Sequence, residues 1–131
     1  RNYPGAIKKP NMYGWISEEN NFFKKVSVKK PLQNPTNDPC IIGTFTYKRA
    51  IDFFNACEIT FKKNKKVNGE FYVDSTINES INLGLNVFLM EVDYFLCWGT
   101  PDDLKTYNYW QECFHKWKLH PYSKNLDNDF I

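Results

Sequence analysis

The pattern of hydrophobic and polar positions near the N-terminus predicts a β-hairpin. Residues 13–16 are mostly aromatic and β-branched, which indicates a short strand. Residues 22–29 predict a second strand, because Phe22, Lys24, Val26 and Val28 stand at alternate positions. The polar residues 17–21 predict the turn between the two strands. Residues 1–12 contain two prolines and a glycine, so we expect them to be a connection.

Two later segments have the composition of strands. Residues 40–47 are rich in β-branched and aromatic side chains, and we expect a central strand there. Gly43 interrupts this segment, which indicates close approach by another backbone or by a ligand. Residues 87–92 predict a further strand, whereas the prolines and asparagines of residues 31–39 predict a loop.

Helical spacing follows the predicted central strand. Apolar residues recur every three or four positions over about 49–63, which predicts an amphipathic helix. One face of a second helix is marked by Val73, Ile77 and Ile81. We expect this helix to start near Asp74 or Ser75 and to stop at Gly84, and Asn68-Gly69 predicts a turn before it.

A third helix has the clearest start signal in the chain. Thr100 is a suitable N-cap, and Pro101 fits the first helical position. Asp102 and Asp103 favour the positive end of a helix, and Thr-x-x-Asp is a variant of the capping box. We therefore predict a helix over 101–117, with its aromatic residues mostly on one side.

The order of these elements, ββ–β–α–α–β–α, predicts a mixed α/β fold with a sheet and flanking helices. Such a sheet needs helices on both faces, and few are available here, so we expect a partner half to be missing. The chain also begins at Arg1 rather than Met, and we expect a fragment or a processed product. Residues 119–131 form a polar tail that we expect to pack loosely.

Composition and charge narrow the function classes. The 131 residues are 42% hydrophobic, which suffices for one core and not for two full domains. A net charge of +2 argues against nucleic-acid and membrane-surface binders, which need a dense basic face. No apolar run approaches the roughly 20 residues of a membrane-spanning helix. We expect a soluble, cytoplasmic protein.

Several common catalytic and metal sites have no match in the sequence. The chain contains no glycine-rich phosphate loop, no H-E-x-x-H and no G-x-S-x-G. Its four cysteines lack C-x-x-C spacing, so we expect free buried thiols rather than disulfides or zinc ligands. Cys113 and His115 are too few for a metal site. We interpret His115 and His120 as surface or capping residues rather than catalytic bases.

Five short motifs occur in one consistent order. They are Tyr13-Gly14, Val28-Lys29-Lys30-Pro31, Ile41-Ile42-Gly43-Thr44-Phe45, Gly69-Glu70-Phe71-Tyr72-Val73-Asp74, and Val92-Asp93-Tyr94 followed closely by Cys97-Trp98-Gly99-Thr100-Pro101-Asp102-Asp103-Leu104. Together they resemble the second half of the sugar-phosphate nucleotidyltransferase family. The resemblance implies that residues 1–131 are the C-terminal, acceptor-side portion of a single Rossmann-like (GT-A-type) domain.

The resemblance also implies a reaction. A phosphorylated sugar or alcohol attacks the α-phosphate of a nucleoside triphosphate, which yields an activated conjugate and pyrophosphate. The chemistry needs in-line positioning, Mg²⁺ and cations around the phosphates. In the family, the nucleotide loop and the first metal aspartate lie in the N-terminal half, which this sequence does not contain. We therefore expect residues 1–131 alone to be inactive and Mg²⁺ to be held mainly by other residues.

Four residues match the acceptor site of the family. Lys30 aligns with the lysine that meets the acceptor phosphate, or it is a solvated lysine at a strand end. Glu70 is expected to accept hydrogen bonds from sugar hydroxyls, or to stabilise a helix start. Gly14 and Gly43 would allow close approach of the substrate, or they serve strand geometry alone.

The sequence departs from the family at two positions. Lys29 stands where the family commonly has a glutamate that binds sugar hydroxyls, which argues for a different acceptor, such as one with another anionic group. Cys97 stands where many members have a metal-binding aspartate, and a thiol is a poor ligand for Mg²⁺. Either the metal is held by other groups or this branch is impaired. Asp93 and Asp102 are nearby in sequence, and Trp98 is expected in a core or pocket wall.

Two other functions stay open. One is a non-catalytic module that binds a sugar phosphate or supports an oligomer. A nucleotide-sugar glycosyltransferase would need an Asp-x-Asp metal motif, and Asp127-Asn128-Asp129 has that spacing, but in the polar tail. For the preferred function the partners are a small phosphorylated sugar or alcohol and a nucleoside triphosphate, and a homo-oligomer is compatible with it.

Overall fold

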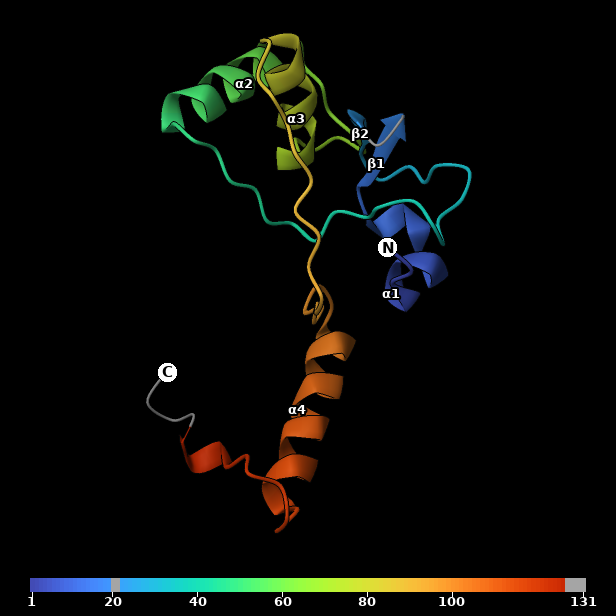
Figure 1. Ribbon diagram of the computed structural model, residues 1–131, viewed down its shortest axis with the longest axis vertical. Coiled ribbons are helices and arrows are strands. Elements are labelled where there is room, and N and C mark those ends of the chain that lie inside the picture. The colour runs from blue at the N-terminus through green and yellow to red at the C-terminus, as the bar shows by residue number, and fades with distance from the viewer. Residues whose placement is uncertain (20–21, 127–131) are drawn as a thin grey trace. The chain divides into compact units, whose positions relative to one another are not determined.

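The computed structural model describes residues 1–19 and 22–126. The chain folds into two units, residues 1–91 and residues 92–131. Over the described residues the elements are four α-helices, a 3-10 helix near the N-terminus, a further 3-10 turn at residues 124–126 and a two-stranded antiparallel sheet (Figure 1). The predicted mixed α/β class is confirmed at this level.

The predicted hairpin is present at the start of the first unit. Strand β1 (Trp15–Glu19) pairs antiparallel with β2 (Phe22–Ser27). Trp15 lies opposite Ser27, and the register shifts by a bulge between Ser17 and Glu18. Residues 20 and 21 of the predicted turn lie outside the described residues. Trp15 is fully buried and is the largest side chain of the core.

The prediction that residues 1–12 are an irregular connection was wrong. They form helix α1 (Pro4–Lys8) and the short 3-10 helix η1 (Pro10–Met12). Each helix has a proline in its first turn, where the fixed φ of proline suits a helix and its missing N–H costs nothing. The Trp15 indole Nε1–H donates to the Pro10 carbonyl at 2.8 Å, which ties this segment to β1.

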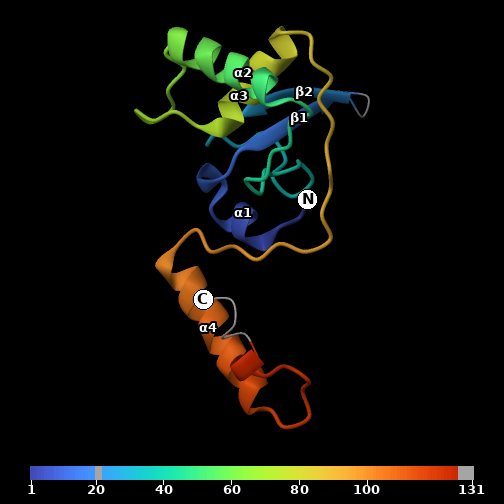
Figure 2. The same ribbon diagram turned by 90° about the vertical axis from the view of Figure 1, so that its left-hand side faces the viewer.

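Helices α2 (Ala50–Lys62) and α3 (Val73–Asn82) confirm the two predicted helices of the first unit. They lie side by side in both views (Figures 1 and 2). The residues they bury are small or polar: Ala56, Thr60, Ser75, Thr76, Glu79 and Ser80. Gly84 has a φ of +78°, which fits the predicted stop after α3.

The apolar face that marks α2 in the sequence stays uncovered in the first unit. Ile51, Phe54 and Phe61 are 53%, 60% and 56% exposed. Helical spacing thus predicted the helix, but the small residues of the opposite face make the contact with α3. Small side chains let two helix backbones approach closely, so this contact forms without the larger apolar residues.

Asn78 joins α3 to the hairpin by imitating a neighbouring strand. Its side-chain Oδ1 accepts from the Val26 N–H at 2.8 Å, and its Nδ2 donates to the Val26 carbonyl at 2.9 Å. Both backbone groups of a strand residue are therefore satisfied by one side chain, as a further strand would satisfy them. This contact fixes α3 against β2 and places the first turn of α3 near the hairpin.

Glu79 is the largest buried charged group of the first unit. Its side chain is fully buried, and Lys63 and Lys65 approach its two oxygens at 2.8 and 2.5 Å. Burial alone would raise the pKa of Glu79. The two ammonium groups and the Asn82 amide outweigh that effect and lower the pKa to about 2. Glu79 is therefore ionised in the folded chain at neutral pH.

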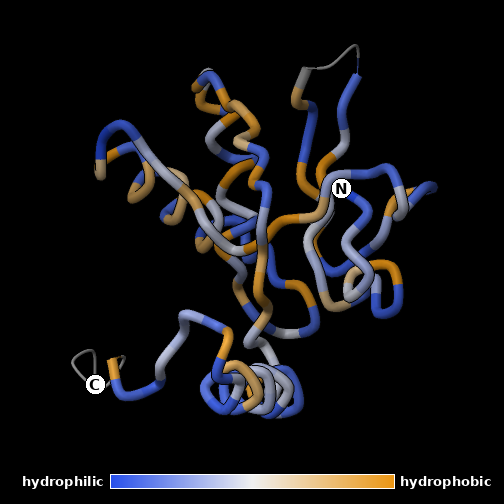
Figure 3. The backbone as a smooth tube through the Cα atoms, turned by 60° about the horizontal axis from the view of Figure 1, so that its bottom comes forward, coloured by the Kyte–Doolittle hydropathy of each residue, from blue (hydrophilic) through white to orange (hydrophobic). Residues whose placement is uncertain are grey.

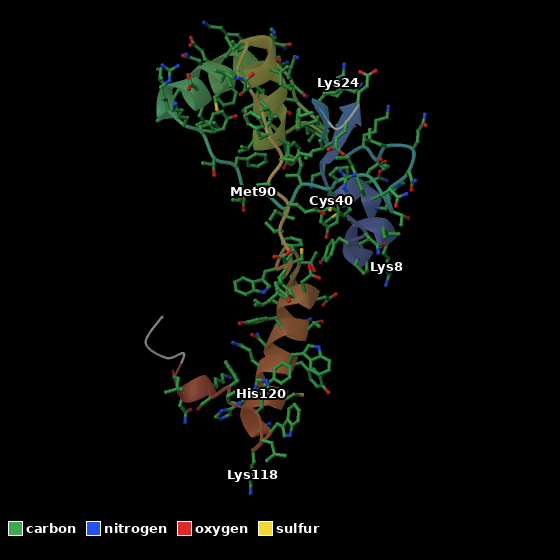
Figure 4. All side chains as sticks on the ribbon, in the orientation of Figure 1. Lys8, Lys24, Cys40, Met90, Lys118 and His120 are labelled. Carbon is green, nitrogen blue, oxygen red and sulfur yellow. The ribbon has the colours of Figure 1, made fainter. Side chains whose placement is uncertain are left out.

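The predicted strands over 40–47 and 87–92 are not strands in the described part of the chain. Residues 40–47 make one bridge, from Cys40 to Trp15, and are otherwise irregular. Residues 87–92 run as an extended segment that carries Met90, labelled in Figure 4. Phe88 and Met90 are 84% and 77% exposed. A strand needs a neighbour to pair its backbone groups, and residues 1–91 supply only one hairpin.

Hydropathy shows the same contrast along the backbone. Figure 3 has hydrophobic positions in the extended segments as well as in the helices and strands. The apolar residues of 87–92 therefore favour a buried strand, although they are not buried as a strand in this chain. The larger Rossmann-like sheet remains a prediction.

Helix α4 (Pro101–Lys116) in the second unit confirms the predicted third helix and its cap. The Asp103 N–H donates to Thr100 Oγ1 at 3.2 Å, and the Thr100 N–H donates to the Asp103 carboxylate at 3.0 Å. This reciprocal pair is the predicted capping box, and it satisfies backbone groups that the first turn leaves unpaired.

The first part of the predicted polar tail folds back on α4 within the second unit. The His120 ring stacks on Phe114 with centroids 4.6 Å apart. Gln111 Nε2 donates to the hydroxyl of Tyr122 at 3.1 Å. Residues 127–131, including the Asp127-Asn128-Asp129 motif, lie outside the described residues.

Two remaining expectations concern membranes and thiols. None of the helices in the described ranges has the length and apolar character that crossing a membrane requires. All four cysteines are free thiols, and each is half-buried rather than buried as predicted.

Candidate functional site

Gly14 is buried at the start of β1, against the first turn of α3. A Cβ atom at this position would lie 2.1 Å from Asp74 Oδ2 and 3.1 Å from Ile41 Cδ1. The Gly14 carbonyl accepts from the Ile41 N–H at 2.8 Å, which holds the glycine in place. Gly14 therefore leaves room for the carboxylate of Asp74, whereas the close approach of a substrate to Gly14 stays a prediction.

Asp74 is a half-buried carboxylate without a side-chain partner. In the part of the chain that the structure describes, no hydrogen bond or ion pair joins it to another side chain. Burial raises the pKa of Asp74 above its usual range, while a hydrogen bond to its own backbone and the charge of Lys29 oppose this. A desolvated carboxylate with free acceptor positions can bind hydroxyl groups.

Lys29 lies in the turn that follows β2 and faces the same region. Its φ is +54°, which is uncommon for a residue with a side chain. The ammonium donates to the Met12 carbonyl and lies 5.3 Å from the centroid of the Tyr72 ring. Lys29 therefore links the end of η1 to the segment that leads into α3.

Glu70 and Tyr72 complete this group of side chains. The predicted Asn68-Gly69 turn is present, with φ of +51° and +82°, and it pairs Val67 with Glu70. The Tyr72 hydroxyl donates to Glu70 Oε2 at 2.6 Å. This hydrogen bond, with smaller effects of burial and nearby carboxylates, raises the pKa of Tyr72. Gly14, Lys29, Glu70, Tyr72 and Asp74 are called the Gly14 cluster below.

Lys30 follows Lys29 of the cluster in the sequence, and Gly43 takes no part in the cluster. Lys30 is exposed, and its carbonyl accepts from Ser27 Oγ at 2.7 Å. Its ammonium forms no ion pair with any described residue, so it is available to an anion. Gly43 has a φ of +92°, and no described atom beyond its chain neighbours lies within 4 Å of its Cβ position. The φ alone explains this glycine.

Sequence reasoning did not assign a role to Asp74 or Tyr72. Asp74 was interpreted only as the start of a helix, although it ends the same motif that contains Glu70. Asp74 lies in the first turn of α3, near Gly14, and it belongs to the same motif as Glu70. That shared motif is the signal that could have identified Asp74. Tyr72 carried no distinguishing pattern.

A separate cavity of about 710 Å³ lies in the first unit. It is lined by residues 46–49 and 85–88 together with Asp52 and Ser80. Arg49 makes a two-pronged pair with Asp52, at 3.0 and 2.6 Å, which lowers the pKa of Asp52. The Arg49 guanidinium of this cavity is thus already paired, Lys48 is its second cationic side chain, and none of the predicted site residues lines it.

Metal ligands are sparse in the structure. Among residues 1–19 and 22–126, no three His, Cys, Asp or Glu side chains gather in a way that could hold a metal ion. Cys97 belongs to the second unit, where its sulfur accepts from the Gly99 N–H at 3.4 Å in the turn before α4. Its thiol is a poor match for Mg²⁺, which prefers hard oxygen ligands.

Comparisons of the chain with models of protein families, with curated proteins and with solved structures gave no match.

Proposed function

We propose that this chain is the acceptor-side part of a nucleotidyltransferase that acts on a sugar phosphate or a related small phosphate. The observation that carries the proposal is the Gly14 cluster. Segments around residues 14, 29 and 70–74, far apart in sequence, meet around one free carboxylate. These are three of the segments whose motifs resemble the family.

The side chains of the cluster suit a phosphorylated polyol. Asp74 and Glu70 offer carboxylate oxygens to hydroxyl groups, and the exposed Lys30 ammonium offers a compact charge to a phosphate. The buried Gly14 brings backbone close to the carboxylate of Asp74. Charge-assisted hydrogen bonds of this kind orient a ligand as well as hold it.

In the proposed reaction the acceptor phosphate oxygen attacks the α-phosphorus of a nucleoside triphosphate. The bond to the bridging oxygen breaks, and pyrophosphate leaves. The role of this chain is to position the acceptor, which is a large part of the catalysis of such transfers. Mg²⁺ would be coordinated by the phosphates and by residues other than 1–131. We place the reaction in the cytoplasmic synthesis of activated sugars for surface polysaccharides.

A second function is a non-catalytic module that binds a sugar phosphate or supports oligomerisation. The uncovered face of α2, formed by Ile51, Phe54 and Phe61, favours it because exposed apolar patches often mark interaction sites. Where the module binds a sugar phosphate, the phosphate ligand lies at the Gly14 cluster in both functions. They differ in whether a nucleotide is transferred.

Calorimetric titration of the chain with a panel of hexose 1-phosphates tests the proposal. Lys30→Ala should weaken binding by about 1.5–3 kcal/mol, or about 10- to 150-fold, because one charge-assisted contact is lost. Lys25→Ala on β2 removes an exposed lysine of the same strand region and serves as the matched control. Equal affinities for wild type and Lys30→Ala would reject the assignment.

A further inference from the structure

We propose that Lys29 determines acceptor specificity by filling a cation site with its own ammonium group. The site consists of the Tyr72 ring, the Met12 carbonyl and the nearby carboxylates of Glu70 and Asp74. An acceptor with a quaternary ammonium group is excluded by this internal cation, whereas a neutral polyol can still bind the free carboxylate. The identity of the acceptor rests on the proposed function, but the cation site does not.

The surroundings of the Lys29 ammonium are those of a bound cation. The Tyr72 ring centroid is 5.3 Å away, within the range in which an aromatic face attracts a positive charge. The Met12 carbonyl accepts a hydrogen bond from the ammonium. The Tyr72 hydroxyl donates to Glu70, which places a carboxylate at the rim of the same ring.

Asp74 adds a second negative charge, and its attraction to Lys29 opposes the rise in the pKa of Asp74 that burial causes. The ammonium of Lys29 is surrounded by two carboxylates, a carbonyl and an aromatic face. These are more cation-binding groups than one lysine side chain requires. Without Lys29 the same groups would leave a negative, aromatic-walled site. Such a site suits a quaternary ammonium ligand.

Backbone geometry holds Lys29 in this position. Its φ of +54° is a left-handed conformation that disfavours residues with a Cβ, so contacts elsewhere must compensate for it. The contacts of the ammonium with Met12 and Tyr72 provide that compensation. Lys30, the next residue, is exposed and remains available to the phosphate of the acceptor.

The consequence for the ligand is a division of roles between two adjacent lysines. Lys30 attracts the phosphate, and Lys29 occupies the place where a cationic head group would otherwise bind. Asp74, which has no side-chain partner among the described residues, is left to accept hydrogen bonds from hydroxyl groups. The accepted class is therefore phosphorylated sugars and sugar alcohols, and the rejected class includes choline phosphate.

The test uses free choline and tetramethylammonium, which carry no phosphate, and follows their binding to the full chain by NMR. Lys29→Met should bind both probes at least tenfold more tightly than wild type. Lys29→Arg keeps the charge and should bind them as weakly as wild type. Adding Tyr72→Leu to Lys29→Met should abolish the gain, because the aromatic wall is then missing.

Lys29→Gln guards against a folding failure, because its amide can still donate to the Met12 carbonyl without a positive charge. If Lys29→Met or Lys29→Gln is folded by circular dichroism and binds the probes no better than wild type, the proposal is overturned. A parallel titration of wild type with glucose 1-phosphate separates the two ideas. Failure of that titration alone contradicts the proposed function, and failure of the choline arm alone contradicts the cation site.

Discussion

Gly14→Ala is the sharpest perturbation of the cluster, because it adds a single carbon atom at its centre. The new Cβ would lie 2.1 Å from Asp74 Oδ2 and 3.2 Å from Asp74 Cγ. The first distance is shorter than Cβ contacts in folded proteins, and the second is shorter than most of them. Aspartate is short, so its carboxylate can escape only by a rotamer change or by a shift of the first turn of α3.

The expected cost follows from two opposing effects. Overpacking of this size destabilises by about 1–3 kcal/mol. Replacing a glycine by alanine also restricts the unfolded chain, which stabilises by about 0.4–1 kcal/mol. The net loss of unfolding free energy for Gly14→Ala should be about 0–2.6 kcal/mol.

A double-mutant cycle with Asp74→Ala isolates the contact. Removing the carboxylate leaves only the 3.1 Å approach to the Ile41 Cδ1 methyl, so in that background Gly14→Ala should cost little, with a coupling of about 1–3 kcal/mol. Urea denaturation measures all four stabilities. Gly99→Ala is the matched control, since its Cβ would meet Cys97 Sγ at an ordinary 3.4 Å. Equal costs of Gly14→Ala in both backgrounds would refute the placement of Asp74 over Gly14.

Three further predictions concern single residues. Glu79→Gln should lower the unfolding free energy at pH 7 by about 1–3 kcal/mol, because a buried carboxylate loses its charge between two half-exposed ammonium groups. Since the pKa of Glu79 is lowered to about 2, this difference should shrink as the pH falls from about 5 to 2. Thr100→Ala should cost about 1 kcal/mol in the first turn of α4, seen as faster amide exchange there. Burial raises the pKa of Cys40, so it should react with iodoacetamide more slowly in the folded than in the urea-unfolded chain.

Each of these predictions has a contradicting result. A constant gap between Glu79→Gln and wild type from pH 7 to pH 2 would contradict the lowered pKa. Thr100→Ser should retain the cap, and amide exchange as fast as in Thr100→Ala would argue against the hydroxyl as its source. Equal reaction rates in the folded and unfolded chain would show that Cys40 is not shielded.

Local signals in the sequence predicted the elements whose stability is local. The capping box at Thr100 and the Asn68-Gly69 turn both formed as expected, because each depends on residues within a few positions. Helices α2 and α3 also followed their spacing and stop signals. A helix satisfies most of its backbone hydrogen bonds internally, so its formation does not depend on pairing with a distant segment. The local sequence pattern is therefore enough to predict it.

Strands and long-range contacts could not be predicted in this way. Residues 40–47 and 87–92 have the composition of buried strands, but a strand forms only where another segment pairs with it. The contact of Asp74 with Gly14 depends on how Asn78 fixes α3 against β2. Nothing in the local sequence around residue 74 encodes that distance. The family resemblance pointed to Gly14 and Glu70, and the structure added Asp74 and Tyr72 between them.

The most direct test of the central claim is an NMR titration of the full chain with glucose 1-phosphate. If the Gly14 cluster receives a phosphorylated polyol, the amide signals of Gly14, Lys30 and Asp74 should shift together and saturate at one dissociation constant. Signals from α4 should stay in place. Absence of any shift at millimolar ligand, or saturable shifts confined to α4, would contradict the account.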